Sequence, residues 1–464
     1  MATSSETPET RDDGVVQALI SALGDKVLTA AEDLEPLSHD RSHHGWELPQ
    51  AAVRATSTED VATAVRICHE HQTPVVPRGS GTGLEGGANT TAGSICIDVS
   101  GMRQVVDIAA DDMYATAEAG VLKSELNAAV EPHGLQFAAG PAIDPSIGGM
   151  ASTSASGTTA VRYGTLKENV LALTVVLADG SVIRTGSTTK KTSAGYDLTH
   201  LFVGSEGTLG IITEVTVNLH PLPACTAVGV WSLPDLETAA QLVVAALRAS
   251  LPLTRVELLD APTIRALKEY NGYTAKPADT IIVEFTGNEA ETPVHYAQFA
   301  QLARSFNAEE FSSTTEPEEV RGTWQARADV LPASQHLVPN AKVLPTDVCV
   351  PISRLPECIL ETKKDLETTD LIAPIAGHVG DGNFHLAILL PPGDEQAYAQ
   401  AKQINERLVD RALAMGGTCT GEHGVGVGKV ASMAKEHRSA VPAMLAVKQA
   451  LDPLGILNPG KVLG

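Results

Sequence analysis

The sequence is poor in basic side chains, cysteine pairs and long apolar runs. Its 33 Lys and Arg face 56 Asp and Glu, a formal net charge of −23, which argues against a nucleic-acid surface because phosphates need clustered cations. The six cysteines form no C-x-x-C pair, which argues against a zinc knuckle, an iron–sulfur cluster held by this chain alone and a disulfide framework. No apolar run approaches the roughly 18 residues of a membrane span, and the polar first residues lack a signal-peptide core. We therefore expect a cytoplasmic protein with at most peripheral contact to membranes.

The 464 residues, 43% of them hydrophobic, suffice for two or three domains with cores of their own. Residues 1–45 form a lead-in with one predicted helix at 13–23. From 46 to 223, short β-branched segments alternate with turns, and the Pro-rich stretch 221–223 marks a boundary. Within this region, Ser57 and Asp60 have the spacing of a capping box and predict a helix start, and Asp179-Gly180 predicts a hairpin turn. From 224 to 464, longer helices separate single strands, with a helix expected after Asp235, a strand at 255–259 and another helix after Asp260. This pattern predicts an α+β fold with two main domains.

Glycines crowd the segment 79–87, where Gly81, Gly83 and Gly86 give a formal G-x-G-x-x-G. The dinucleotide fingerprint of that form must open a helix, but here the chain runs on into a predicted strand at 95–99. Consecutive backbone N–H groups, free of obstructing side chains, suit a nest that binds a diphosphate. The alternative is a long flexible turn.

Two further runs of small residues, 140–157 and 204–210, lie in the same half of the chain. Three such segments in one domain indicate a large, extended nucleotide rather than a single phosphate, although 140–157 alone is equally consistent with a tightly packed turn. The segment 424–430 resembles a P-loop but fails as one, because His423 stands where that motif needs glycine and Val430 follows its lysine.

Two histidines flank an Asp-Gly turn in the segment 377–385. A two-residue hairpin turn at Asp381-Gly382 would put His378 directly opposite His385, with Cβ atoms roughly 5 Å apart. That separation lets two imidazoles share a divalent metal, and the alternative is a surface histidine pair.

Glu422, between glycine and histidine, is a candidate third ligand in a His₂Glu set with an open coordination position. The neighbouring His423 would point to the other side and act as a base. An exposed Glu-His pair in a loop is the alternative.

Together these segments are similar to the FAD-linked D-lactate dehydrogenases, within the vanillyl-alcohol oxidase/p-cresol methylhydroxylase flavoprotein superfamily. The similarity runs from about residue 40 to the C-terminus. The motifs that carry it are 77–87 (PRGSGTGLEGG), 160–165 (AVRYGT), 201–210 (LFVGSEGTLG), 346–351 (TDVCVP), 377–385 (GHVGDGNFH), 418–424 (TCTGEHG) and 458–461 (NPGK). The resemblance implies an FAD-binding domain of the p-cresol methylhydroxylase type with two subdomains, at 46–223. It also implies an α+β cap domain at 224–464 that holds substrate and metal, with the C-terminal tail returning to the flavin.

The resemblance further implies a reaction and the residues that carry it out. His378, His385 and Glu422 would bind a divalent metal, zinc or manganese, and His423 would take the proton of the substrate hydroxyl. The expected reaction is oxidation of a small D-2-hydroxy acid, D-lactate to pyruvate, with hydride transfer to the flavin.

Arg327 matches the family's carboxylate-binding arginine, and Asn383 a polar contact to substrate or flavin. The residues that the resemblance assigns to FAD are Pro77, Arg78, Gly79, Ser80, Gly81, Thr82, Gly83, Leu84, Gly86, Gly87, Pro141, Asp144, Gly148, Gly149, Ser152, Ser154, Gly157, Tyr163, Glu206, Gly207, Gly210, Ile211, Ile212 and Asn458.

FAD is expected to be non-covalent, because the segment 79–87 contains no His or Cys. The electron acceptor stays open among a quinone, a cytochrome, an electron-transfer protein and oxygen, and so does assembly into a homodimer.

Other substrates and other classes of protein are alternatives. The similar D-2-hydroxyglutarate dehydrogenases carry a basic residue near the position of Pro345, which disfavours a second substrate carboxylate here, although Lys342 lies nearby. Glycolate oxidase catalytic subunits are nearer rivals, because one methyl group is worth only about 1–3 kcal/mol of discrimination. FAD-dependent transferases of ether-lipid synthesis lack the 377–385 motif. A non-enzymatic flavin-binding module remains an alternative, and a nicotinamide dehydrogenase is disfavoured by the missing helix after residue 87.

Overall fold

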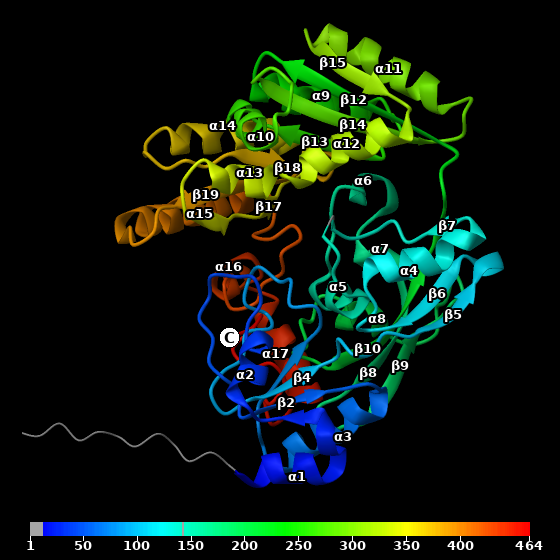
Figure 1. Ribbon diagram of the computed structural model, residues 1–464, viewed down its shortest axis with the longest axis vertical. Coiled ribbons are helices and arrows are strands. Elements are labelled where there is room, and N and C mark those ends of the chain that lie inside the picture. The colour runs from blue at the N-terminus through cyan, green and yellow to red at the C-terminus, as the bar shows by residue number, and fades with distance from the viewer. Residues whose placement is uncertain (1–12, 142) are drawn as a thin grey trace, which may run out of the picture.

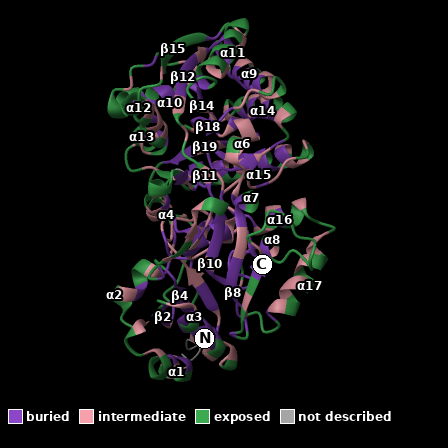
Figure 2. Ribbon diagram, turned by 90° about the vertical axis from the view of Figure 1, so that its right-hand side faces the viewer, coloured by how far each residue is buried: buried purple, intermediate pink, exposed green. Residues whose placement is uncertain are grey.

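The computed structural model describes residues 13–141 and 143–464 as two halves stacked end to end (Figure 1). The N-terminal half contains residues up to about 221 together with the last two helices, and the cap contains most of the remainder. Each half has its own buried interior (Figure 2). Among the described residues, no helix is long and apolar enough to cross a bilayer.

A four-stranded sheet forms the first subdomain of the N-terminal half, in the order β1-β2-β4-β3, with β2, β4 and β3 parallel. The Ser57 side chain accepts a hydrogen bond from Asp60 N–H and so begins α3, the helix that connects β2 to β3, as the sequence predicts. The expected lead-in is part of this subdomain, because β1 pairs with β2 and Val15 and Leu19 of α1 are buried in its core. The elements are α1 (Asp13–Leu23), β1 (Val27–Leu28), α2 (Ala31–Leu34), β2 (Ala51–Arg54), α3 (Thr58–Glu70), β3 (Val75–Arg78) and β4 (Ile95–Asp98).

A five-stranded antiparallel sheet, β5-β6-β10-β8-β9, forms the second subdomain. The predicted Asp179-Gly180 hairpin joins β8 and β9, and places Val176 opposite Val182. A short pair, β7 and β11, leads toward the cap. The elements are β5 (Val105–Ala109), β6 (Tyr114–Glu118), α4 (Lys123–Val130), β7 (Leu135–Gln136), α5 (Ile147–Thr153), α6 (Ala160–Tyr163), α7 (Leu166–Asn169), β8 (Val170–Val176), β9 (Val182–Gly186), α8 (Thr199–Phe202), β10 (Ile211–Asn218) and β11 (His220–Pro221).

The cap is built on an eight-stranded antiparallel sheet in the order β15-β12-β14-β13-β18-β19-β16, with β17 paired to β19. Asp235 and Asp260 cap the helices that the sequence predicts after them, by accepting hydrogen bonds from Thr238 and Thr263 N–H. The elements are β12 (Cys225–Leu233), α9 (Leu236–Arg248), β13 (Arg255–Leu259), α10 (Ala261–Asn271), β14 (Asp279–Gly287), α11 (Thr292–Ser305), β15 (Glu309–Thr314), α12 (Pro317–Ala328), α13 (Val330–His336), β16 (Lys342–Pro345), β17 (Val348–Cys349), α14 (Leu355–Leu366), β18 (Ile375–Gly377), β19 (Asn383–Leu390) and α15 (Glu395–Ala414).

After the cap, the chain returns to the N-terminal half. The helices α16 (Val430–Glu436) and α17 (Val441–Leu451) are drawn in red in Figure 1. Val447 and Leu451 of α17 pack against the core of the second subdomain, and Lys448 Nζ donates to Thr208 O (2.7 Å). The following segment then adds to the edge of the first sheet, since Val75 N–H donates to Ile456 O (2.8 Å) and Asn458 N–H donates to Val75 O (2.7 Å).

The predicted register of the histidine hairpin is wrong. His385 lies opposite Ala376, not opposite His378. A 3₁₀ turn at Val379–Asp381 replaces the two-residue turn, so His378 stands just before the turn and outside the strand ladder. The reason is packing, because Gly382 at φ +80° lies so close to β17 that a Cβ there would sit 2.0 Å from Val350 O.

Candidate active site

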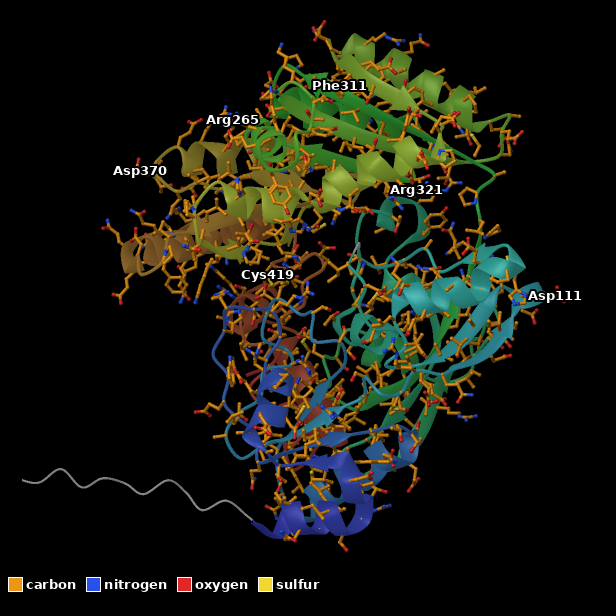
Figure 3. All side chains as sticks on the ribbon, viewed as in Figure 1. Asp111, Arg265, Phe311, Arg321, Asp370 and Cys419 are labelled. Carbon is orange, nitrogen blue, oxygen red and sulfur yellow. The ribbon has the colours of Figure 1, made fainter. Side chains whose placement is uncertain are left out.

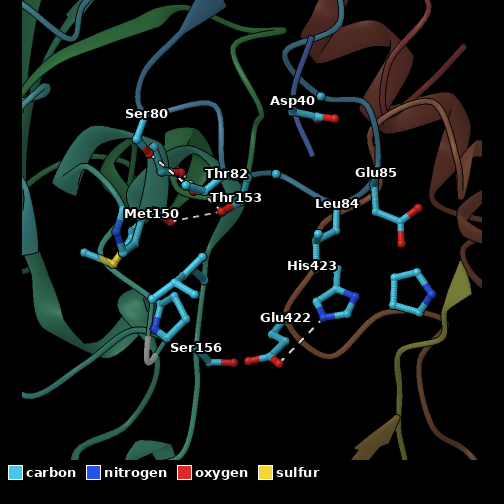
Figure 4. Close-up of a pocket in the computed structure, with 18 of the residues that line it drawn as sticks. Asp40, Ser80, Thr82, Leu84, Glu85, Met150, Thr153, Ser156, Glu422 and His423 are labelled. Atoms are coloured by element: carbon cyan, nitrogen blue, oxygen red, sulfur yellow. Dashed lines mark hydrogen bonds and ion pairs between the residues drawn. The ribbon is translucent and has the colours of Figure 1, made fainter. Parts of the chain in front are cut away.

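A cavity of about 480 Å³ lies where the two halves meet, and side chains from both halves line it. Figure 4 shows Ser80 and Thr82 of the N-terminal half on one side, and Glu422 and His423 on the other. Figure 3 shows Cys419, close to that second pair in sequence, at the junction of the two halves. The volume is in the range of roughly 300–1,000 Å³ that is common for small-molecule sites.

The glycine segment after β3 is held against the start of α5. Ser146 Oγ accepts hydrogen bonds from Ser80 N–H (3.4 Å) and Gly149 N–H (3.3 Å), and Ser80 Oγ accepts one from Ser146 N–H (3.2 Å). A Cβ on Gly79 would lie 2.5 Å from Ser146 Oγ, so this contact needs glycine. The segment leads into β4 and not into a helix, as the sequence predicts.

The third small-residue run reaches across to the cap side. Buried Glu206 accepts hydrogen bonds from Val425 N–H (2.6 Å) and Gly426 N–H (2.9 Å), both just after His423. Burial raises the pKa of Glu206 to about 7, although the two backbone N–H groups oppose the shift. The wall of the cavity therefore connects the N-terminal half directly to the segment that contains His423.

Most of the residues assigned to FAD line the cavity, and the wall suits that cofactor. Buried Asp40 Oδ2 at the wall has no hydrogen-bond partner among the described residues, so it can accept from a ligand hydroxyl. Gly207 lies so close to Pro77 that a Cβ on it would meet Pro77 Cγ at 2.3 Å. The absence of a side chain at Gly207 therefore allows two glycine-bearing segments to be in close contact. The residues assigned to FAD that do not line the cavity are Gly86, Asp144, Ser154, Gly157, Tyr163, Gly210 and Asn458.

Three of these seven residues have other contacts. Asp144 accepts hydrogen bonds from Ser124, Tyr163 lies with its hydroxyl 3.5 Å from that of Thr286, and Asn458 donates to Gly87 O (3.0 Å) and Glu206 O (2.7 Å). Asn458 thus joins two of the cavity-lining segments from behind.

His378, His385 and Glu422 meet at one place in the cavity wall. Glu422 Oε1 lies 3.3 Å from His378 Nε2 and 3.2 Å from His385 Nε2, and the two ring centroids are 5.5 Å apart. Within the part of the chain that the structure describes, buried His385 Nε2 and Glu422 Oε2 have no hydrogen-bond partner. Two imidazoles and a carboxylate with unsatisfied atoms form a donor set that zinc and manganese accept.

Contacts at the other ring nitrogens orient both imidazoles. His378 Nδ1 donates to Glu257 Oε1 (2.6 Å), and His385 Nδ1 donates to Thr346 O (3.1 Å). Because Nδ1 of each ring donates elsewhere, Nε2 is the ring nitrogen that faces Glu422. Burial lowers the pKa of His378, but Glu257 and Glu422 outweigh it and raise that pKa to about 10. The site thus concentrates negative charge that attracts a cation, whether a proton or a metal ion.

The sequence predicts that His423 points away from Glu422, to the other side. In the structure, His423 instead lines the same cavity as Glu422. Its ring stacks on that of His385, with centroids 5.1 Å apart and planes at 9°, because its backbone N–H is held by Asp347 Oδ2 (3.0 Å). Burial lowers the pKa of His423, which leaves the ring neutral near pH 7 and able to accept a proton.

Of the two polar residues that the resemblance assigns to the site, Arg327 lines the cavity and Asn383 does not. Arg327, on α12, lines the cavity, and its Nε donates to Glu257 Oε2 (2.7 Å). Asn383 lies behind the wall, where its Nδ2 donates to Asp347 Oδ1 and Val348 O, both at 2.8 Å. The same buried carboxylate, Glu257, therefore holds both Arg327 and His378.

The sequence reasoning missed Glu257, Asp347 and Lys429. Glu257 is an acid within the apolar strand 255–259, and such a buried carboxylate is a signal that requires a cationic partner. Asp347 stands in the 346–351 motif, where no local pattern indicates its role. Lys429 belongs to the segment 424–430, which resembles a P-loop but fails as one.

Two family models match the chain, an FAD-binding domain over residues 49–186 and the C-terminal domain of FAD-linked oxidases over residues 222–462. A probable mitochondrial D-lactate dehydrogenase of Danio rerio is 43% identical over 97% of this chain and 91% of its own length. The mitochondrial D-lactate dehydrogenase [cytochrome] of Arabidopsis thaliana is 40% identical over 91% of this chain and 74% of its own length. The glycolate oxidase subunit GlcD of Bacillus subtilis is 32% identical over 92% and 91%.

Solved structures share the fold. Substrate-bound p-cresol methylhydroxylase superposes with a TM-score of 0.79 over 98% of this chain and 97% of its own, at 18% identity. An alkyldihydroxyacetonephosphate synthase superposes with a TM-score of 0.76 over 98% and 87%, also at 18% identity. At such low identity these matches establish the fold alone.

The chain has the fold of p-cresol methylhydroxylase, and its N-terminal half contains an FAD-binding domain. The chain belongs to the FAD-linked oxidase family that includes the D-lactate dehydrogenases. The predicted family, α+β fold class, FAD cofactor and enzyme class are thereby confirmed. D-lactate dehydrogenases at 36–43% identity stand above GlcD at 32%, which favours the lactate interpretation over the glycolate alternative.

The predicted cytoplasmic location is wrong. Four similar D-lactate dehydrogenases, from an animal, a plant and two yeasts, are named as mitochondrial, which points to the mitochondrion rather than the cytoplasm. The error has a physical cause, since net charge and composition govern association and binding, whereas sorting signals set the compartment.

Proposed function

We propose that this enzyme oxidises D-lactate to pyruvate and passes the electrons from FAD to a cytochrome. The observation that carries the proposal is the convergence of Arg327, His423 and the glycine segments on one cavity. The names of similar relatives, D-lactate dehydrogenases [cytochrome] of Arabidopsis thaliana and Saccharomyces cerevisiae, support the substrate and the acceptor.

The residues of the cap bind and deprotonate the substrate. Arg327 binds the carboxylate of lactate with the terminal N–H groups of its guanidinium, while its Nε stays fixed on Glu257. His423 takes the hydroxyl proton, since its lowered pKa keeps it neutral at the working pH. FAD, when bound, supplies the acceptor for the hydride that leaves C2.

We further propose that His378, His385 and Glu422 hold a divalent metal ion, zinc or manganese. The unsatisfied His385 Nε2 and Glu422 Oε2, together with the anchored Nδ1 atoms, support this ligand set. Such an ion would supply Lewis acidity toward the substrate hydroxyl and so make its proton easier for His423 to remove.

The lining of the cavity favours a substrate with one carboxylate. Pro345 lies at the wall and offers no charge, whereas Lys342 is exposed at the start of β16 and is not part of the lining. Arg255 does line the cavity, but it stacks on Trp324 at 4.6 Å and its Nε lies 3.3 Å from buried Glu284, so it already has a carboxylate beside it. D-2-hydroxyglutarate is therefore expected to be a poor substrate.

Anaerobic reduction of the bound flavin tests the proposal directly. D-lactate is expected to bleach the flavin faster than L-lactate, glycolate or D-2-hydroxyglutarate, and addition of oxidised cytochrome c is expected to restore the oxidised spectrum. If glycolate reduces the flavin faster than D-lactate, the glycolate alternative replaces the lactate proposal.

Chelation and H378A test the metal. Both are expected to reduce the rate of flavin reduction by about 100-fold while the spectrum of the bound flavin stays unchanged, and zinc or manganese should restore the chelated enzyme but not H378A. Unchanged D-lactate reduction in H378A would contradict the metal site. A matched control is H220A, because His220 lies on β11 and outside the cavity lining.

A further inference from the structure

Asp347 is fully buried in the turn between β16 and β17, and its carboxylate binds the segment that contains two of the proposed site residues. Asp347 Oδ2 accepts hydrogen bonds from the N–H groups of Gly421 (2.8 Å), Glu422 (2.9 Å) and His423 (3.0 Å), and from Thr420 Oγ1 (2.8 Å). Three consecutive backbone N–H groups converge on one oxygen, which fixes the path of the chain through residues 421–423.

Other side chains hold the flanks of this segment, since Glu436 accepts from Cys419 N–H and Glu206 accepts from Val425 and Gly426 N–H, but the N–H groups of residues 421–423 all donate to Asp347. Residues 415–429 connect α15 to α16 without helix or strand, apart from a single bridge between Thr418 and Cys349. A Cβ on Gly421 would lie 2.2 Å from Asn383 Nδ2, so the chain presses directly against the side chain that occupies Asp347 Oδ1. The local path of the backbone at residues 421–423 therefore depends mainly on the carboxylate of Asp347.

Lys429 connects this carboxylate to the N-terminal half. Its side chain is 5% exposed, and its Nζ donates to Asp347 O (3.2 Å) and lies 3.5 Å from Asp347 Oδ2 and 3.3 Å from Glu85 Oε1. Glu85 belongs to the glycine segment 79–87 and lines the cavity. The buried cation Lys429 thus lies between Asp347, which holds residues 421–423, and Glu85, which belongs to the glycine segment 79–87.

We propose that Asp347 is a positioning residue, which sets the places of Glu422 and His423 against the substrate and, through Lys429, against the cofactor-binding segment. This inference rests on the proposed function for the roles of those two residues. Arg327 is held separately, by Glu257 on β13 and by its own helix, so carboxylate binding does not depend on Asp347. Loss of Asp347 should therefore impair kcat and leave KM nearly unchanged.

The decisive variant is D347N. An asparagine presents one N–H₂ group, and in either amide orientation that group faces a donor, either the three backbone N–H groups or Asn383 Nδ2. The matched control is E436Q, because Glu436 Oε2 accepts from Cys419 N–H (2.8 Å) and Thr418 Oγ1 (3.0 Å) in the same segment but does not touch residues 421–423.

In D347N, with FAD content and flavin spectrum unchanged, we expect kcat for D-lactate to fall by about 100-fold and KM to change by less than about threefold. The backbone amides of residues 421–423 should exchange with deuterium at least about tenfold faster than in the wild type, and E436Q should match the wild type in kcat, KM and the exchange of these amides. T420V removes one donor only, so it serves if D347N does not fold, and it should lower kcat by about threefold to tenfold at constant KM.

Unchanged amide exchange in D347N, or a kcat within threefold of that of E436Q, would overturn the proposal. Failure of the proposed function can be distinguished from failure of the proposal for Asp347. If D-lactate does not reduce the wild-type flavin, the substrate assignment falls, and amide exchange at 421–423 in D347N against E436Q still decides the role of Asp347.

Discussion

The buried carboxylate of Glu257 accepts a hydrogen bond of 2.6 Å from His378 Nδ1, and so connects the centre of β13 to the proposed metal site. Its other oxygen accepts one of 2.7 Å from Arg327 Nε. Burial opposes ionisation of Glu257, but His378 and Arg327 outweigh it and lower its pKa, so the acid stays charged. One side chain therefore orients both a proposed metal ligand and the proposed carboxylate-binding residue.

The variant E257Q should lose the orientation of the proposed metal ligand His378 and of the proposed carboxylate-binding Arg327 together. A glutamine can accept from only one of the two donors and leaves the other unpaired in a buried site, which costs roughly 3–5 kcal/mol when a charged partner is involved. We expect kcat/KM for D-lactate to fall by at least about 100-fold, with a raised KM because Arg327 is released. Steady-state kinetics measure this, and a kcat/KM within threefold of the wild type would contradict it.

The control for E257Q is E284Q on the neighbouring strand β14. Glu284 is also a buried acid near an arginine, Arg255 at 3.3 Å, but it contacts neither His378 nor Arg327. Similar losses in both variants would mean that any buried acid of this sheet is required, and not the specific link to the site.

Gly207 and Gly134 separate two costs of adding a methyl group. Both glycines have φ +72°, but a Cβ on Gly207 would meet Pro77 Cγ at 2.3 Å, whereas one on Gly134 would meet nothing within 4 Å. G134A should therefore cost only the backbone strain of about 1–2 kcal/mol, and G207A about 1–3 kcal/mol more. Urea unfolding of the holoenzyme measures both free energies, and equal values would show that the contact between Gly207 and Pro77 relaxes freely.

Asp260 should make stability decrease between about pH 4 and pH 6. Burial raises the pKa of Asp260 to about 6, against the N–H groups of Thr263 and Ile375, so the folded chain binds this proton more tightly than the unfolded chain. The contribution is fully present below the unfolded-state pKa and is lost as the pH rises through the folded-state pKa, a difference of about 3 kcal/mol.

The variant D260N removes this titration while keeping a residue that caps helices well. Its unfolding free energy should be lower overall but should fall less steeply from pH 4 to pH 6 than that of the wild type. Urea titrations at half-unit pH steps test this, and parallel curves for the two proteins would exclude the raised pKa.

Elements with local signals could be predicted from the sequence. Ser57, Asp235 and Asp260 begin helices because a side-chain oxygen satisfies a free N–H group within the same short segment. The strand at 255–259 and the Asp179-Gly180 hairpin were predicted for the same reason, since all the information lies within a few residues.

The histidine hairpin shows where local signals stop. An Asp-Gly pair indicates a turn but does not fix its length, and the contact of Gly382 with Val350 favours a 3₁₀ turn over the two-residue turn. The rings of His378 and His385 still meet, through Glu257 and Thr346 rather than through strand register. Asp347 was missed because the backbone N–H groups that it holds, at residues 421–423, lie more than 70 residues away in the chain, and no pattern in one sequence encodes such a pair.

The pairing of Val75 with the segment around Leu457 also determines how late in synthesis the first sheet can be completed. During translation, β3 leaves the ribosome long before its last neighbour exists, and an unpaired strand edge is a site for aggregation. The outer edge of β3 therefore stays unpaired until almost the whole chain has been synthesised, and a chain that ends before residue 456 would keep that edge exposed.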